Sequence, residues 1–239
     1  MTTIIGLCGT LRHGSFNRML LRAAVEAAPP GTSIEPESIR EIPLYDGDVE
    51  EEHGVPAAVQ RLKDRIAEAD GLLIVTPEYN ASIPGVLKNA IDWLSRPAAD
   101  IPRVFRGRPV AIMGATPGPG GTALSQAAWL PVVRTLGMRT WFEGRVLISD
   151  AARAFDNDGR VADEATPPRI RTFVEGLAVF AGVQQRQYDR CVRYVTAPRL
   201  CGQSMAGLPN GSPDTSRSSF ATQSVSPASA YRGTHRWPC

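Results

Sequence analysis

Five strand-like segments alternate with five helix-like segments along the chain. This alternation predicts an α/β fold: a doubly wound, five-stranded parallel sheet with helices on both faces. The strand-like segments are short apolar runs with little charge, as expected for strands that are buried on both faces. The segments between them place apolar residues at helical spacing, so that one side of each helix can pack on the sheet.

The strand-like segments differ in how clearly they show their pattern. Residues 2–8 (TTIIGLC) are rich in β-branched residues and uncharged, and residues 33–39 alternate apolar and polar positions. Residues 69–75 (ADGLLIV) form the clearest buried strand, and residues 108–115 (RPVAIMGA) form another. Residues 140–148 predict the fifth strand.

The helix-like segments follow these strands at regular intervals. We predict helices over residues 15–28, 56–68, 86–95, 123–136 and 168–183. Pro29-Pro30-Gly31 ends the first of them, because proline and glycine interrupt helical structure. Two other stretches, residues 42–54 and 151–164, are polar, and we expect both to be surface loops.

Composition limits the classes of function. The 239 residues are 43% hydrophobic, enough for a substantial core, and carry a net charge of +2. Residues 186–239 account for +5 and the remainder for −3, so we expect no nucleic-acid partner for the main body. We also expect no membrane segment, no secretory signal and a cytoplasmic location. Neither a CxxC motif nor metal-ligand spacing of histidines occurs, so we expect no metal site.

The same shift in composition predicts the domain organisation. Residues 1–185 contain all the predicted strands and helices and form one domain. Residues 186–239 are rich in Ser, Arg, Pro and Thr and lack helical or strand periodicity. We predict that they form a mobile, disordered tail instead of a second domain.

The loop after the first strand has the chemistry of a phosphate site. Gly9 and Gly14 allow the backbone to approach a ligand, and Arg12 supplies a charged, planar fork. The helix that begins near Ser15 adds unpaired N–H groups and a positive dipole end. The alternative is that Ser15 only caps the helix and Arg12 is a solvated charge. The absence of both G-x-x-x-x-G-K-[ST] and G-x-G-x-x-G argues against a P-loop NTPase and a standard dinucleotide fold.

Two further unusual loops follow the third and fourth strands, over residues 76–85 and 116–122. In the flavodoxin-like strand order 2-1-3-4-5, these loops and the first one lie together at the carboxyl edge of the sheet. We therefore expect all three loops to line one crevice.

Three motifs in these loops, GTLRHGSFNRMLL, TPEYNASIPGVLKNAIDWLSRP and TPGPGGT, resemble the NADPH-dependent FMN reductase family. The resemblance spans about residues 2–184, and PEYN…PG.LKNA.DW is its most specific part. The chain departs from the family at Thr10, where serine is usual, and in its last 55 or so residues, which have no counterpart there.

The resemblance implies an FMN site formed by all three loops. The first loop would bind the FMN phosphate, and the second and third would pack on the flavin ring. The implied residues are Gly9, Thr10, Arg12, Ser15, Phe16 and Asn17 in the first loop; Pro77, Glu78, Tyr79, Asn80 and Ser82 in the second; and Ala115, Thr116, Gly118, Gly120 and Gly121 in the third.

The resemblance also implies an oxidoreductase. Hydride would pass from NADPH or NADH through bound FMN to a small acceptor, such as a quinone, free flavin, azo compound or chromate. We expect no catalytic acid or base, because the cofactor carries the chemistry. Family members are homodimers or homotetramers.

Two other hypotheses remain open. One is a flavodoxin-type FMN electron carrier without nicotinamide activity; the charge of −3 is less acidic than such carriers usually are. The other is a domain that kept the fold and lost the flavin.

Overall fold

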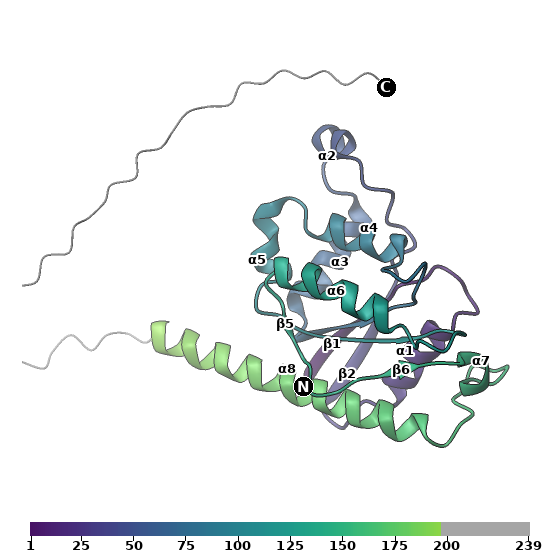
Figure 1. The fold of residues 1–239 in the computed structure, drawn as a ribbon. Coiled ribbons are helices and arrows are strands. Elements are labelled where there is room, and N and C mark those ends of the chain that lie inside the picture. Colours follow the sequence, from purple (N-terminus) through teal and green to yellow (C-terminus); the bar gives the residue numbers. More distant parts are fainter. Residues whose placement is uncertain (197–239) are drawn as a thin grey trace, which may run out of the picture. The chain divides into compact units, whose positions relative to one another are not determined.

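A computed structural model of the chain describes residues 1–196. Its strands form one parallel sheet in the order β2-β1-β3-β4-β5, with β6 also paired to β4. The predicted fold class and strand order are therefore confirmed, and Figure 1 shows helices on both sides of the sheet. The strands are β1 (Thr2–Cys8), β2 (Thr32–Glu37), β3 (Gly71–Val75), β4 (Pro109–Ala115), β5 (Arg139–Thr140) and β6 (Leu147–Ile148).

Helices connect these strands and follow the predicted positions closely. The helices are α1 (Phe16–Glu26), α2 (Gly47–His53), α3 (Ala57–Glu68), α4 (Gly85–Leu94), α5 (Ile101–Val104), α6 (Ala123–Thr135), α7 (Ala151–Ala154) and α8 (Thr166–Thr196), with a 3₁₀ turn, η1, at Ala98–Asp100. The turn η1 and α5 occupy a connection for which the sequence pattern predicts no element.

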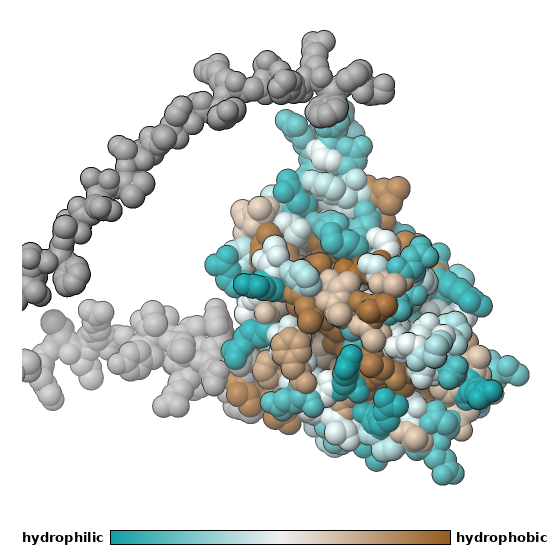
Figure 2. Space-filling view, in the orientation of Figure 1, coloured by the Kyte–Doolittle hydropathy of each residue, from teal (hydrophilic) through white to brown (hydrophobic). Residues whose placement is uncertain are grey.

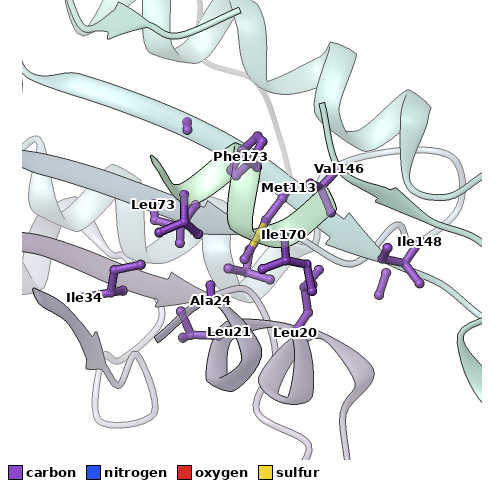
Figure 3. Close-up of a cluster of buried hydrophobic side chains, with 14 of the residues drawn as sticks. Leu20, Leu21, Ala24, Ile34, Leu73, Met113, Val146, Ile148, Ile170 and Phe173 are labelled. Atoms are coloured by element: carbon purple, nitrogen blue, oxygen red, sulfur yellow. The ribbon is translucent and has the colours of Figure 1, made fainter. Parts of the chain in front are cut away.

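The sheet separates two apolar cores. On one face α1 and α8 pack on the sheet, and Figure 3 shows Leu20 and Leu21 of α1 with Phe173 of α8 beside Leu73 and Met113 of the strands. On the other face α3, α4 and α6 bury a second cluster of apolar side chains, including the large indole rings of Trp93 and Trp129. The fully apolar central strands thus have a partner layer on each side, as their sequences predict.

The fifth strand differs from its prediction. The structure has two short strands instead of one over residues 140–148, and they pair with opposite ends of β4. Between them Trp141 turns into the core, where its ring meets Phe173 edge-on at a centroid distance of 4.9 Å. A Cβ on Gly144 would lie 2.2 Å from the Trp141 ring, so the bend requires glycine there. Burial of one large ring outweighs the hydrogen bonds of a continuous strand.

The two predicted loops also contain helices. Residues 42–54 include α2, which Asp46 caps by accepting a hydrogen bond from the Asp48 amide at 3.0 Å. Asp48 and Glu50 lie in its first turn, where their negative charges stabilise the helix by interacting with the positive end of its dipole. No residue of α2 is buried, which explains why apolar periodicity gives no sign of this helix. The second stretch, residues 151–164, contains the short α7 and a bridge between Phe155 and Val161.

The last helix is longer than predicted. α8 begins at Thr166 and runs to Thr196, beyond residue 183 where we expect its end and beyond the predicted domain boundary at residue 185. The rest of the predicted tail, residues 197–239, lies outside the described residues, so its proposed mobility stays a prediction.

Candidate functional site

The three unusual loops begin side by side at the carboxyl edge of the sheet. β1, β3 and β4 are parallel neighbours: Cys8 pairs with Val75, and Val75 pairs with Met113. β1 and β3 therefore end at the same level, whereas β4 continues beyond them to Ala115. All three loops still leave the sheet at its carboxyl edge, as the strand order requires.

Direct contacts then hold the loops together. A Cβ on Gly9 would lie 3.0 Å from Cδ of Pro77, which places the first loop against the second. A Cβ on Gly114 at the end of β4 would lie 2.2 Å from the Thr76 carbonyl oxygen, so the start of the second loop crosses β4 closely. The convergence of the loops therefore depends on glycine at both positions.

The first loop leads into α1 with an ordered set of donors. Ser15 caps the helix by accepting a hydrogen bond from the Asn17 amide at 3.2 Å, and the Thr10 hydroxyl accepts one from the Arg12 amide at 3.2 Å. Thr10 is only 7% exposed and Ser15 only 8%, whereas Arg12 is exposed. The first turn of α1 contains no acidic residue. This helix terminus therefore keeps its positive dipole end available to an anion.

Phe16 and Asn17, which the resemblance places at a phosphate, have structural partners as well. The ring of Phe16 stacks on that of Phe155, with centroids 6.1 Å apart. The buried Asn17 amide donates to the Ala115 carbonyl at 2.7 Å and accepts from the Ala115 amide at 2.9 Å. Asn17 thus ties the first turn of α1 to the end of β4, where the third loop begins. Contact of either residue with a phosphate stays a prediction.

The second loop folds into a tight hairpin turn. Tyr79 and Ser82 exchange backbone hydrogen bonds of 3.2 and 3.0 Å, and Asn80 and Ala81 between them adopt φ of 50° and 58°. Two successive left-handed residues are the signature of a type I′ turn, and alanine adopts that conformation at a cost. The turn presents Tyr79, which is 50% exposed.

Glu78 joins the second loop to the third. Its carboxylate accepts hydrogen bonds from the Leu124 and Ser125 amides, at 2.9 and 3.0 Å, and so caps the first turn of α6. Thr122, the residue at the cap position, has φ of 69° and makes no side-chain cap of its own. Glu78 therefore replaces the local cap from a distant part of the chain.

The third loop leaves open space above its backbone. A Cβ on Gly118 or Gly120 would meet no atom nearer than 3.9 Å, and the same holds for Gly14 in the first loop. Gly121 differs, because φ of 59° and the nearby Leu147 both require glycine there. The Thr116 hydroxyl accepts a hydrogen bond from the Gly118 amide at 3.4 Å. The open backbone suits a planar ligand lying against it.

The sequence reasoning does not predict a buried polar cluster that lies at the start of the second loop. The Thr76 hydroxyl lies 3.0 Å from the Ser125 hydroxyl and accepts a hydrogen bond from Nε1 of Trp129 at 3.1 Å. A hydroxyl at the end of an otherwise apolar strand was the one available signal. The cluster fixes the start of the second loop to α6.

These features fit FMN in charge and in shape. The α1 terminus, with Arg12, Thr10 and Ser15, offers a cationic set of donors for a phosphate, while the equivalent terminus of α6 is already capped by a carboxylate. The turn bearing Tyr79 and the open glycines of the third loop flank the same edge. Within residues 1–196, no cluster of three or more His, Cys, Asp or Glu side chains could hold a metal ion. In the same part of the chain, no helix has the length and apolar character needed to cross a bilayer.

Known proteins resemble this chain over most of its length. The profile of the family described as NADPH-dependent FMN reductase matches residues 2–153. An NAD(P)H-dependent FMN reductase of Pseudomonas aeruginosa is 42% identical over 177 residues, covering 74% of this chain and 94% of the relative. A 2-hydroxy-1,4-benzoquinone reductase of a Burkholderia species is 38% identical, covering 72% of this chain and 92% of that protein.

A solved structure shows the same architecture. The flavoenzyme NAD(P)H:(acceptor) oxidoreductase FerB of Paracoccus denitrificans superposes with a TM-score of 0.69 at 33% identity, covering 77% of this chain and 99% of FerB. The family profile covers more than half of the chain, including all three loops. The chain therefore belongs to the NADPH-dependent FMN reductase family.

Proposed function

We propose that this protein is an NAD(P)H-dependent FMN oxidoreductase that passes a hydride from reduced nicotinamide, through bound FMN, to a quinone. The observation that carries this proposal is the convergence of three loops on one sheet edge beside a helix terminus free of acidic side chains. The names of the Pseudomonas and Burkholderia relatives and of FerB support the coenzyme and the acceptor.

The protein's part in this reaction is to bind and orient. FMN supplies the hydride chemistry when bound. Arg12 and the hydroxyls of Thr10 and Ser15 would hold its phosphate by charge-assisted hydrogen bonds at the start of α1. Pro77, Tyr79 and Asn80 would shape one side of the ring site, and the backbone from Ala115 to Gly121 the other. Ser82 would fix the turn through its backbone bonds with Tyr79.

The closure of the site also comes from the chain's own side chains. Asn17 and Glu78 each bridge two of the loops, so the phosphate end and the ring end are held at fixed separation. The reaction needs no side chain that acts as a general acid or base, because the flavin ring of FMN itself would accept the hydride.

A homo-oligomer and a cytoplasmic location belong to the same proposal. Large apolar side chains stay exposed on the second loop and on α6, among them Tyr79, Leu124 and Leu130. Figure 2 shows brown apolar side chains gathered among hydrophilic ones on the face over α6, which carries two of these residues. Exposed apolar area of this kind supports contact between subunits. Light scattering on the purified protein measures the oligomeric state.

One experiment tests the function directly. The visible spectrum of the purified full chain, loaded with FMN, is recorded before and after NADPH is added without oxygen, and again after a benzoquinone is added. We expect the flavin absorbance to bleach with NADPH and to return with the quinone. Bound FMN that NADPH fails to reduce would point to the electron-carrier hypothesis. Protein that takes up no FMN would contradict both.

A further inference from the structure

A cavity lies beside the first loop, on the side of the segment that follows β2. Its volume is about 690 Å³, and it is bounded by the first loop, one side of α1, the segment that follows β2 and residues 157–159. Thr10 is the single residue shared between this lining and the residues predicted to hold FMN. The cavity is therefore a neighbour of the FMN site and distinct from it.

The cavity carries an excess of positive charge. Arg18, Arg22 and Arg40 line it. Its two carboxylates, on Glu37 and Asp158, are both engaged by arginines outside the lining: Nε of Arg65 lies 2.9 Å from Glu37, and Nη1 of Arg160 lies 3.1 Å from Asp158. The two carboxylates of the cavity therefore form no ion pair with its own arginines.

The three arginines differ in how firmly they are held. Arg22 donates to the Asp158 carbonyl at 2.9 Å and has a long ion pair of 3.8 Å with Glu26. Arg40 donates to the Leu11 carbonyl. Arg18 is exposed and has no ion pair or hydrogen bond from its side chain within the described part of the chain. Arg18 is therefore the cation most available to a ligand.

The rest of the lining is largely apolar. Met19, Leu21 and Val25 from α1 face Pro36 and Ile39 from the segment at the end of β2. The cavity thus combines a cationic rim with an apolar wall, and its lining includes the imidazole of His13 but no Phe, Tyr or Trp. This combination suits a ligand with one charged end and an apolar body.

We propose that this cavity binds a small organic anion, whose phosphate, sulfonate or carboxylate is held by Arg18, Arg22 and Arg40 while its body lies on Met19, Leu21 and Val25. Two sources share this chemistry: the phosphorylated adenosine part of a coenzyme and an aromatic sulfonate. The proposal does not depend on electron transfer, so it stands or falls separately from the proposed function.

The test uses two probes against the FMN-saturated full chain, so that the phosphate loop is already filled. Adenosine 2′,5′-bisphosphate and 1-anilinonaphthalene-8-sulfonate are each titrated by calorimetry. If the chain takes up no FMN, the same titrations are run without it. We expect saturable binding of one equivalent of at least one probe, weakened by added salt.

Matched variants locate the binding. Arg18→Ala is expected to weaken binding roughly tenfold, since it removes a charge-assisted contact, and Arg18→Ala/Arg22→Ala to abolish saturable binding. Arg134→Ala, which removes an exposed arginine of α6 on the other face of the sheet, should bind as the wild type does. Circular dichroism confirms that each variant is folded.

The outcomes distinguish the two ligand classes, and two of them would overturn the proposal. Binding of the bisphosphate alone assigns the cavity to a phosphorylated ligand, and binding of the sulfonate alone or of both assigns it to organic anions more widely. The proposal is overturned if neither probe binds saturably, or if Arg18→Ala and Arg134→Ala bind a probe equally well.

Discussion

Arg12 is the one exposed guanidinium of the predicted phosphate loop, so its contribution can be measured alone. Arg12→Ala should weaken FMN binding by about 1.5–3 kcal/mol, on the order of ten- to a hundredfold, because a charge-assisted hydrogen bond is lost. Titration followed by flavin fluorescence measures the affinity, with Arg134→Ala as the control. Unchanged affinity in Arg12→Ala would refute the role assigned to this side chain.

Glu78 gives a second test at the scale of one residue, because it caps a helix across two loops. Glu78→Ala should lower the free energy of unfolding by about 1–2 kcal/mol, as the two amides at the start of α6 lose their acceptor. Glu78→Gln keeps an acceptor oxygen and should cost less. Urea unfolding measures both, with the exposed Glu143→Ala as the control. Equal stability of Glu78→Ala and Glu143→Ala would exclude the capping role.

Cys8 predicts a dependence on pH. Burial raises the pKa of its thiol from 9.0 to about 11. The folded protein therefore holds this proton more tightly than the unfolded chain does, so the stabilisation is complete below pH 9 and is lost as pH rises toward 11. A pKa shift of this size corresponds to a contribution of about 2–3 kcal/mol to the free energy of unfolding.

The measurement compares two proteins. Unfolding free energies of the wild type and of Cys8→Ala are determined at several pH values between 8 and about 11. The wild type should lose more stability with rising pH than the variant does, since other groups that titrate in this range are common to both. Parallel curves would show that Cys8 does not contribute.

At the scale of elements, the segment of residues 42–54 that carries α2 depends on a few polar contacts with α4. Asn89 accepts a hydrogen bond from the Tyr45 amide at 2.8 Å and donates to the Pro43 carbonyl at 2.7 Å. Nε1 of Trp93 also donates to Pro43, at 3.0 Å. Because α2 has no buried residue, the segment is held by these hydrogen bonds, by the edge-on contact of the Tyr45 ring with Trp93 and by the ion pair between Glu50 and Arg96.

Asn89→Ala should therefore loosen this segment without affecting the sheet. We expect the opening free energy of residues 42–54 to fall by about 1–2 kcal/mol, seen as faster amide hydrogen exchange there. Lys88→Ala on the same helix removes only a surface ion pair with Asp92 and should leave exchange unchanged. Faster exchange across β1 and β3 as well would show that the effect is not local.

The elements also show what a sequence pattern can and cannot predict. Apolar runs locate β1, β3 and β4, and helical spacing locates the large helices, because these elements bury apolar side chains. They do not locate α2, whose side chains all stay in contact with solvent, or the break in the last strand, which a contact between Trp141 and Phe173 decides. Patterns record burial, whereas caps and long-range ring contacts depend on residues distant in the chain.

In the candidate site too, the sequence predicts the general arrangement but not the long-range contacts. The strand order alone predicts that the three loops meet, and the structure bears this out. The bonds that hold the loops to one another, from Asn17 to Ala115 and from Glu78 to Leu124, join residues 98 and 46 positions apart. No local motif could have revealed them, although the family resemblance assigns both Asn17 and Glu78 to the FMN site.

At the scale of the whole molecule, FMN should stabilise the fold by mass action. At a free concentration a hundredfold above its dissociation constant, FMN should increase the free energy of unfolding by about 2.7 kcal/mol. This increase should raise the melting temperature by about 5–11 °C for a domain of this size. Differential scanning calorimetry with and without FMN measures this change. An unchanged melting temperature would indicate that FMN does not bind the folded chain.

The link between Asn17 and Ala115 has a consequence for the speed of cofactor uptake. It joins the anchoring helix to the sheet before any flavin arrives, so the conformational entropy of arranging that corner is lost during folding and not on association. The apoprotein therefore presents a preorganised binding site to the cofactor. Flavin would then enter in one bimolecular step, at a rate proportional to its concentration and without a lag.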